Sequence, residues 1–293
     1  MDAQAVTTLE VIGRQLDQGI FPAVMNGGIV VPSELTVPLS VLGAEHRHDE
    51  FGREARSAPG AWPGAPPWQG SFPGARQAGE TASIIDPGLQ TGYEAQLDAV
   101  RAAYPGVRVW HQGYGFWMLT HSALLPGLQR SAVFLTAVPF YQATPRSWGF
   151  WRGIPIDVAW IGPRHTNFPD GSICAFEPTD GSWVIGDSLV ALLDLFTLWS
   201  LRHVHLERFG RWPGHQAVRV PFERLAELGK DEHCGCDAGE ARYGECCRPA
   251  DLNRNRIADA VSFFLRLGER KPPDAVLAVL RAQTEPPALA TVY

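Results

Sequence analysis

The sequence lacks the features that mark membrane-spanning, secreted or nucleic-acid-binding proteins. No stretch approaches the roughly 18 uninterrupted apolar residues that cross a bilayer. The longest apolar segment, from Leu189 to Trp199, contains Asp194 and Thr197. No basic stretch followed by an apolar run opens the chain, so we expect no secretory signal. The net charge of -6 argues against a surface built for nucleic acid or acidic lipid. We expect a cytoplasmic protein with no membrane or nucleic-acid partner.

Lysine and cysteine are both scarce. Lys230 and Lys271 are the only lysines, which fits a base-composition bias of the source genome or a lysine-modifying enzyme that presents few target amines itself. The five cysteines are an odd number, and without a secretory signal they argue against a disulfide framework. Four crowd between Cys234 and Cys247, whereas Cys174 stands alone. The chain therefore uses cysteine for two different purposes.

Composition divides the chain into four stretches. Residues 1–56 form an N-terminal extension that opens with a helical pattern, and residues 57–80 are so rich in Pro and Gly that they predict a linker. Residues 81–215 are denser in regular elements and form the main domain. Residues 216–293 form a C-terminal module that contains the four clustered cysteines.

The main domain shows the pattern of an antiparallel meander between two helices. Tyr93–Tyr104 predicts an amphipathic helix, and Asp187 is a good N-cap for a buried helix from Ser188 to about Arg208. Between them, β-branched and aromatic runs separated by Gly/Pro turns predict strands. These runs are Val107–Trp110, Tyr114–Thr120, Ala132–Phe140 and Ile156–Ile161. The predicted fold class is α+β, a four-stranded antiparallel meander flanked by helices.

The C-terminal module reads as short helices around the cysteines. A helix is expected from Pro221 to Leu228, and another from Pro273 to Ala282. Between them, Asp251 is expected to cap a helix with one apolar face. The residues of that face are Ile257, Val261, Phe264 and Leu265.

Cys174 ends a turn-rich loop that begins near Pro163 and has an amide side chain, Asn167, seven residues before the thiol. A thiol can form a thioester and so divide one acyl transfer into two easier steps. An asparagine NH2 nearby can donate to the oxyanion that develops when an amine attacks. A buried, inert thiol is the alternative interpretation, since most free cysteines are of that kind.

The order and spacing of several motifs resemble the ubiquitin-conjugating enzyme family. Ser131–Phe140 is similar to that family's second and third strands, and Pro155 lies ten residues before His165, as its proline does before the histidine of the His-Pro-Asn tripeptide. His165-Thr166-Asn167 resembles that tripeptide, and the five residues ending at Cys174 resemble Asn-Gly-Ser-Ile-Cys. Trp183 matches the tryptophan beyond the cysteine. Thr166 replaces the family's proline, and the interval from Asn167 to Cys174 is one residue shorter.

The resemblance implies an activity. Cys174 would accept a ubiquitin-like protein from an activating enzyme as a thioester and pass it to an amine on a target protein, as in prokaryotic relatives associated with antiviral conjugation pathways. Asn167 would steady the oxyanion, while His165 and Trp183 would support the loop. The carboxylates that could assist the incoming amine are Asp170, Glu177, Asp180 and Asp187.

The cysteine cluster predicts a metal. Cys234, Cys236, Cys246 and Cys247 lie within fourteen residues, and a CxC followed by a CC can place four thiolates around Zn2+. A pair of disulfides is the alternative, disfavoured in a reducing compartment. The pattern is similar to the SEC-C zinc motif, with a turn one residue longer and acidic. Four protein ligands leave no open position, so we expect a structural zinc.

Two other functions compete with conjugation. A catalytically inactive conjugating-type scaffold would bind an activating enzyme or another partner through its two modules. A cysteine hydrolase would pair Cys174 with His165 as its base, but no hydrolase-type nucleophile elbow is present.

Overall fold

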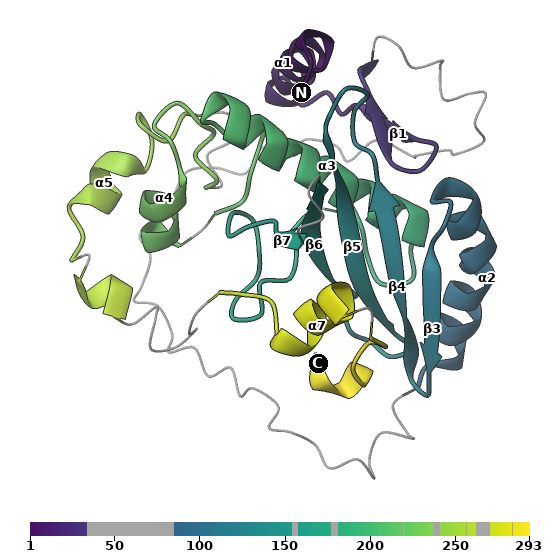
Figure 1. The fold of residues 1–293 in the computed structure, drawn as a ribbon. Helices are drawn as coiled ribbons and strands as arrows, with labels where there is room; N and C mark the ends of the chain where they lie inside the picture. Colours follow the sequence, from purple (N-terminus) through teal and green to yellow (C-terminus); the bar gives the residue numbers. More distant parts are fainter. Residues whose placement is uncertain are drawn as a thin grey trace, which may run out of the picture.

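The structure, a computed structural model, is a three-layered arrangement in which helices cover both faces of one sheet (Figure 1). It describes residues 1–33, 85–153, 158–176, 181–218, 220–236, 241–255, 257–261, 270–282 and 284–293. The predicted linker 57–80 lies outside the described residues, so its prediction stays untested.

The central sheet is an antiparallel meander whose strands follow one another in sequence order, β3-β4-β5-β6-β7. Its two longest pairings join β5 to both neighbours: β4 pairs from Gly115 opposite Pro139 to Ser122 opposite Ala132, and β6 pairs from Arg146 opposite Ala137 to Gly153 opposite Arg130. The strands are β3 (Arg108–Gln112), β4 (Gly115–Ser122), β5 (Arg130–Pro139), β6 (Arg146–Gly153) and β7 (Val158–Trp160).

The sheet therefore has five strands, and the prediction of four was wrong. The missed strand is β6, whose tryptophans and central Gly149 did not give a strand pattern. The match of Ser131–Phe140 to two successive strands was also wrong, because Arg130–Pro139 is the single continuous strand β5. The α+β class and the meander order are confirmed.

Helices α2 (Pro87–Ala103) and α3 (Leu189–Phe209) pack on one face of the sheet. Asp86 caps α2, since its Oδ1 accepts from the backbone N–H of Gly88 at 2.9 Å. The predicted cap Asp187 was wrong by one residue: Ser188 caps α3, and Asp187 accepts from the N–H of Val184 instead. Helix α3 ends at Gly210, whose φ of 71° is the usual left-handed stop.

Helix α3 is the hydrophobic centre of this layer. It has the length and hydropathy of a membrane span, yet 67% of the relevant window is buried inside the fold, as in the core helix of a soluble protein. The amino-terminal helix α1 (Ala3–Asp17) and the hairpin β1 (Ala23–Met25) and β2 (Ile29–Val31) pack against it.

The chain's last residues cover the opposite face of the sheet. Val276 and Val279 of α7 (Asp274–Ala282), with Leu289 of the 3-10 helix η4 (Leu289–Thr291), join a second apolar core. Alternation along β5 explains the two cores: Phe134 points into the first and Leu135 into the second. The sheet is thus buried on both sides, as Figure 1 shows for α7 in front and α3 behind.

A small third core surrounds the thiols. Leu225 of α4 (Pro221–Glu227) packs against it, and α5 (Arg248–Leu252) follows Cys247 directly. The predicted cap Asp251 was wrong: it lies within α5, and its carboxylate forms a buried bidentate pair with Arg224, both bonds 2.8 Å long. Phe264 and Leu265 lie outside the described residues.

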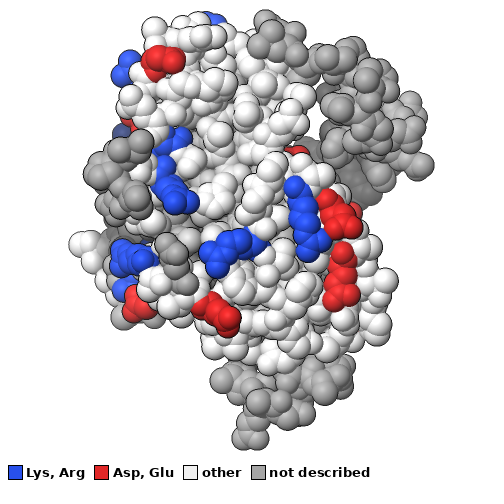
Figure 2. Space-filling model, turned by 45° about the vertical axis from the view of Figure 1, so that its right-hand side comes forward, with Lys and Arg blue, Asp and Glu red and all other residues white. Residues whose placement is uncertain are grey.

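On the face shown in Figure 2, basic groups lie across the middle and acidic groups lie mainly beside and below them, over a mostly uncharged surface.

Candidate functional site

The lone cysteine ends a narrow hairpin between β7 and α3. Thr166 and Ile173 pair across it, and the N–H of Asn167 donates to the Ser172 carbonyl at 2.7 Å. Asp170 makes the turn, since its Oδ1 accepts from the backbone N–H of Ser172 at 3.0 Å. Gly171, at φ 65°, completes it where a side chain would meet the backbone of Lys271.

Three neighbouring segments hold this hairpin in place. Trp148 of β6 donates through Nε1 to the Asp170 carbonyl at 2.8 Å. Arg270 donates to the Thr166 carbonyl at 3.0 Å and also pairs with Glu223 and Glu227 of α4. The sheet, α4 and the approach to α7 therefore all fix the loop that carries the thiol.

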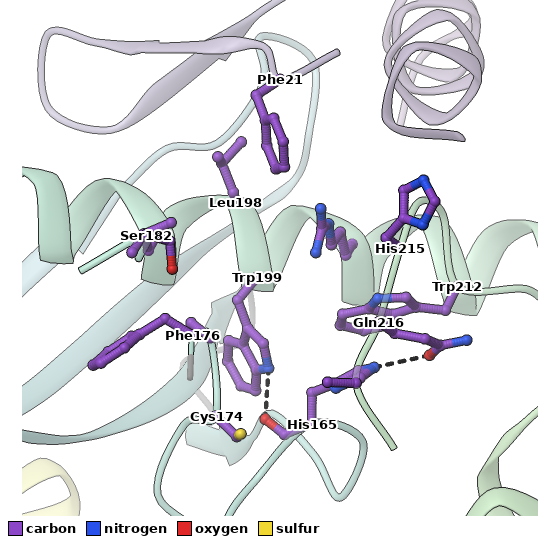
Figure 3. A pocket seen from close by; sticks show the side chains of 14 residues that line it. Phe21, His165, Cys174, Phe176, Ser182, Leu198, Trp199, Trp212, His215 and Gln216 are labelled. Atoms are coloured by element: carbon purple, nitrogen blue, oxygen red, sulfur yellow. Dashed lines mark hydrogen bonds between the residues drawn. The ribbon is translucent and has the colours of Figure 1, made fainter. Parts of the chain in front are cut away.

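Cys174 is partly exposed and lines a pocket of about 340 Å³ (Figure 3). Its backbone N–H donates to the His165 carbonyl at 2.9 Å, and the same oxygen accepts from Nε1 of Trp199 at 2.9 Å. The pocket lies between α3, the residues that follow Cys174, and the segment 212–217. It is lined by Phe21, His165, Cys174, Ala175, Phe176, Ser182, Leu195, Leu198, Trp199, Arg202, Trp212, His215, Gln216 and Ala217.

His165 is a positioning residue. Its φ is +50°, its ring lies 4.5 Å from that of Trp212, and its Nε2 is 3.0 Å from Oε1 of Gln216. Burial, reinforced by the nearby positive charge of Arg164, lowers the pKa of His165 to about 3. The imidazole is therefore neutral, and Nε2 carries its hydrogen because an amide oxygen can only accept.

Asn167 braces the hairpin itself. Its Nδ2 donates to Ser172 Oγ and to the Ile173 carbonyl, each at 3.2 Å. It belongs to the same hairpin as Cys174, yet among the described residues it is not one that lines the pocket. In this structure the amide donates to oxygens of its own loop.

Trp183 is buried beneath the start of α3. Its Nε1 donates to the Ser188 carbonyl at 2.9 Å, and its ring lies 5.3 Å from that of Phe176. It supports the pocket wall without lining the pocket.

Of the candidate carboxylates, two have clear structural partners. Asp170 pairs with Arg146 at 2.8 Å, and Asp187 accepts from the N–H of Val184. Glu177 and Asp180 lie outside the described residues.

Several pocket residues were not predicted from the sequence. Trp199, Arg202 and Leu198 come from α3, and Trp212 and Gln216 come from the segment after it. One signal was present: Arg202 is a charge within a helix whose circumference is otherwise mostly apolar, and such a charge needs a partner or a function. The contribution of residues 212–217 required knowledge of the tertiary fold.

The four clustered cysteines converge as predicted. Sulfur atoms of Cys234, Cys236, Cys246 and Cys247 all lie within 4.8 Å of one another and could hold a metal ion. The Cys236–Cys246 and Cys246–Cys247 sulfur pairs are 3.6 and 3.9 Å apart. These separations are too long for disulfides. They match the roughly 3.8 Å between sulfurs placed tetrahedrally at about 2.3 Å from one Zn2+.

The chemistry of these thiols also fits a cation. Burial and the neighbouring sulfurs raise the pKa of Cys246 to about 11, and the pKa of Cys247 rises further. These two thiols thus resist becoming thiolates by themselves, whereas a bound divalent cation reverses that preference.

A polar network joins the thiol cluster to the Cys174 hairpin. Gln216 accepts from Arg164 at 2.8 Å through Oε1 and donates to the His233 carbonyl at 2.7 Å through Nε2. Arg164 and Glu232 form a buried ion pair, and Glu232 also accepts from the N–H of Trp212 at 2.7 Å. His233 directly precedes Cys234, so the two sites share one connected framework.

Comparison with known proteins identifies no relative: no family model, curated protein or solved structure matches the chain. The functional argument therefore depends on the site itself.

Proposed function

We propose that the chain is a conjugating-type acyl carrier that accepts a ubiquitin-like protein as a thioester on Cys174 and transfers it to an amine on a target protein. The observation that supports this proposal is the placement of a partly exposed thiol at a pocket, on a hairpin held by its neighbours through the His165 carbonyl. The residues around Cys174 resemble the motif of the ubiquitin-conjugating enzyme family, and this resemblance indicates that the acyl group is a ubiquitin-like protein.

The proposed reaction has two balanced steps. The Cys174 sulfur attacks the thioester carbonyl carried by an activating enzyme, the new S–C bond forms, and the donor thiol leaves with a proton. A target amine then attacks the same carbonyl, the bond to Cys174 breaks, and its thiol is restored as the amine loses a proton. Because the entering acyl group is already a thioester, the step does not need a strongly acidified thiol.

The test is a charging reaction with the full-length protein, a candidate activating enzyme, ATP and its ubiquitin-like protein. We expect an adduct that a reducing thiol removes, that Cys174→Ala abolishes, and that Cys174→Ser converts into an ester resistant to reduction. Asn167→Ala is expected to charge normally and to discharge to amines more slowly. A complete system that charges no residue of this chain would refute the proposal.

We also propose that the metal at the four thiols is zinc, in a structural role. All-sulfur tetrahedral sites favour Zn2+, and four protein ligands leave no position for a substrate. The purified protein should contain about one zinc per chain by elemental analysis, and Cys236→Ser should lose it.

One observation favours the scaffold alternative. The amide of Asn167 donates to Ser172 and Ile173. This side chain would have to rotate before it could donate a hydrogen bond to the oxyanion of the acyl transfer. If the protein is a scaffold, Cys174→Ala retains binding to the activating enzyme and all biological effect, whereas Cys236→Ser loses both.

The hydrolase alternative has less support. A general base works best with a pKa near the operating pH, and burial lowers the pKa of His165 to about 3.

A further inference from the structure

The pocket beside Cys174 contains a cation without an obvious counter-charge. Arg202 of α3 lines the pocket, and its Nε is buried with no hydrogen-bond partner among the described residues. Its guanidinium carbon lies 5.8 Å from the centroid of the Phe21 ring. A cation–π contact at that distance does not satisfy the N–H donors.

Among the described residues, no carboxylate forms an ion pair with Arg202. The acid that acts on it electrostatically is Asp17, but Asp17 already pairs with Arg211 at 2.7 Å and accepts from the N–H of Gly214. No carboxylate is among the described lining residues. Burial lowers the pKa of Arg202 only to about 10, so the guanidinium stays charged at neutral pH.

Arg202 is partly exposed, although its Nε is buried, and a charge taken even partly out of water is normally paired because its desolvation is costly. By contrast, Arg164, which is buried at the start of the Cys174 hairpin, pairs with Glu232. Arg202 lines the pocket and has an N–H donor without a hydrogen-bond partner among the described residues. We therefore expect a ligand to supply the missing anion.

We propose that this pocket binds a small carboxylate with an apolar or aromatic body, its carboxylate held by Arg202 and its body by the aromatic walls. The cavity of about 340 Å³ is at the lower end of the range for small-molecule sites. Phe21, Phe176, Trp199 and Trp212 supply the walls.

The charge balance selects a carboxylate over a phosphate. One guanidinium matches one carboxylate in a bidentate fork, whereas a phosphate would bring a second negative charge. Two imidazoles also line the pocket, His165 and His215. Burial keeps His165 neutral, and the exposed ring of His215 lies 4.2 Å from that of His233. This inference requires no thioester chemistry, so it stands or falls separately from the proposed conjugating activity.

Phenylacetate and its neutral isostere phenylacetamide make a matched pair of probes. We expect saturable binding of phenylacetate to the full-length, metal-loaded protein by calorimetry, at least about tenfold tighter than binding of the amide. That ratio is what one charge-assisted bidentate pair supplies. Bound phenylacetate should also slow alkylation of Cys174 by iodoacetamide, followed on the Cys174 peptide by mass spectrometry.

Arg202→Met should remove the preference for the acid and the protection of Cys174. The matched control is Arg208→Met, an exposed arginine on the same helix, which should retain both. Arg202→Met should also leave the melting temperature unchanged or raised, because it removes a partly buried charge that has no ion-pair partner among the described residues. Equal binding of both probes, no saturable binding of phenylacetate, or a large fall in melting temperature with Arg202→Met would overturn the proposal.

Discussion

At the scale of single residues, the candidate site depends on side chains that stay neutral. His203 of α3 is buried beside Trp199 and Trp212, with ring centroids 4.5 and 5.0 Å away. Its Nε2 donates to the Arg164 carbonyl at 3.0 Å. Burial lowers the pKa of His203 to about 3, and the positive charges of Arg164 and Arg130 add to that effect. This histidine fixes α3 to the start of the Cys174 hairpin.

A depressed histidine pKa makes stability depend on pH. Below about pH 6.5 the unfolded chain binds a proton at His203, whereas the folded protein does not. The contribution of neutral His203 to the free energy of unfolding is therefore complete above pH 6.5 and is lost as the pH falls toward 3. Between pH 6 and 4, His203→Gln should reduce the slope of unfolding free energy against pH by about 1.4 kcal/mol per unit. Urea unfolding at a series of pH values measures this slope. The exposed His111→Gln serves as control, and parallel profiles for wild type and His203→Gln would contradict the assignment.

At the scale of elements, the sequence predicted most helices and strands because apolar periodicity follows from burial. The strand over Ala132–Phe140 matches β5 within two residues at each end, and the helix over Tyr93–Tyr104 ends within one residue of α2 but begins six residues late. The strand β6 was missed because Gly149 interrupts its aromatic residues, and glycine is ordinarily read as a turn. Asp251 was misread as a cap because its partner, Arg224, is far away in sequence.

The glycine in β6 has a tertiary reason. A Cβ at Gly149 would lie 2.6 Å from Cζ3 of Trp199, the residue that holds the His165 carbonyl. Gly149→Ala should displace Trp199 and cost about 1–3 kcal/mol of unfolding free energy, as overpacking does. It should also speed alkylation of Cys174.

The control for this prediction lies in the same strand. At Gly153 the nearest atom to a new Cβ is 3.9 Å away, an ordinary contact. Gly153→Ala should therefore change stability little. Equal stability losses for the two variants, measured by thermal unfolding, would show that the contact with Trp199 is unimportant.

The small thiol-bearing core depends on its buried ion pair. The side chains of Arg224 and Asp251 are 8% and 4% exposed, so Asp251→Asn would leave a buried guanidinium without its counter-charge. Removing one partner of such a pair costs about 3–5 kcal/mol, and the metal should be released at a lower denaturant concentration. The much more exposed pair Arg254–Asp259, 53% and 33% exposed, provides the control, because Asp259→Asn should cost at most about 1 kcal/mol.

At the scale of the whole molecule, long-range arrangement was the part that the sequence could not supply. The convergence of Cys234 to Cys247 followed from local spacing and was predicted. Local patterns did not show that α7 covers the second face of the sheet, or that residues 212–217 and Arg202 meet Cys174 in one pocket. Those contacts join segments far apart in sequence, and only packing decides them.

The network through Gln216 predicts that the metal affects the reactivity of a thiol outside its own site. Removing the metal should loosen His233, which precedes Cys234, and with it the bond from Gln216 to the His233 carbonyl. Gln216 would then hold His165 less firmly, and the His165 carbonyl positions the backbone of Cys174. We expect a chelator to increase the alkylation rate of Cys174 several-fold, measured on its own peptide by mass spectrometry. Gln216→Ala should increase the alkylation rate of Cys174 in the same way while the metal content stays unchanged. If neither the chelator nor the substitution alters that rate, the two sites are independent.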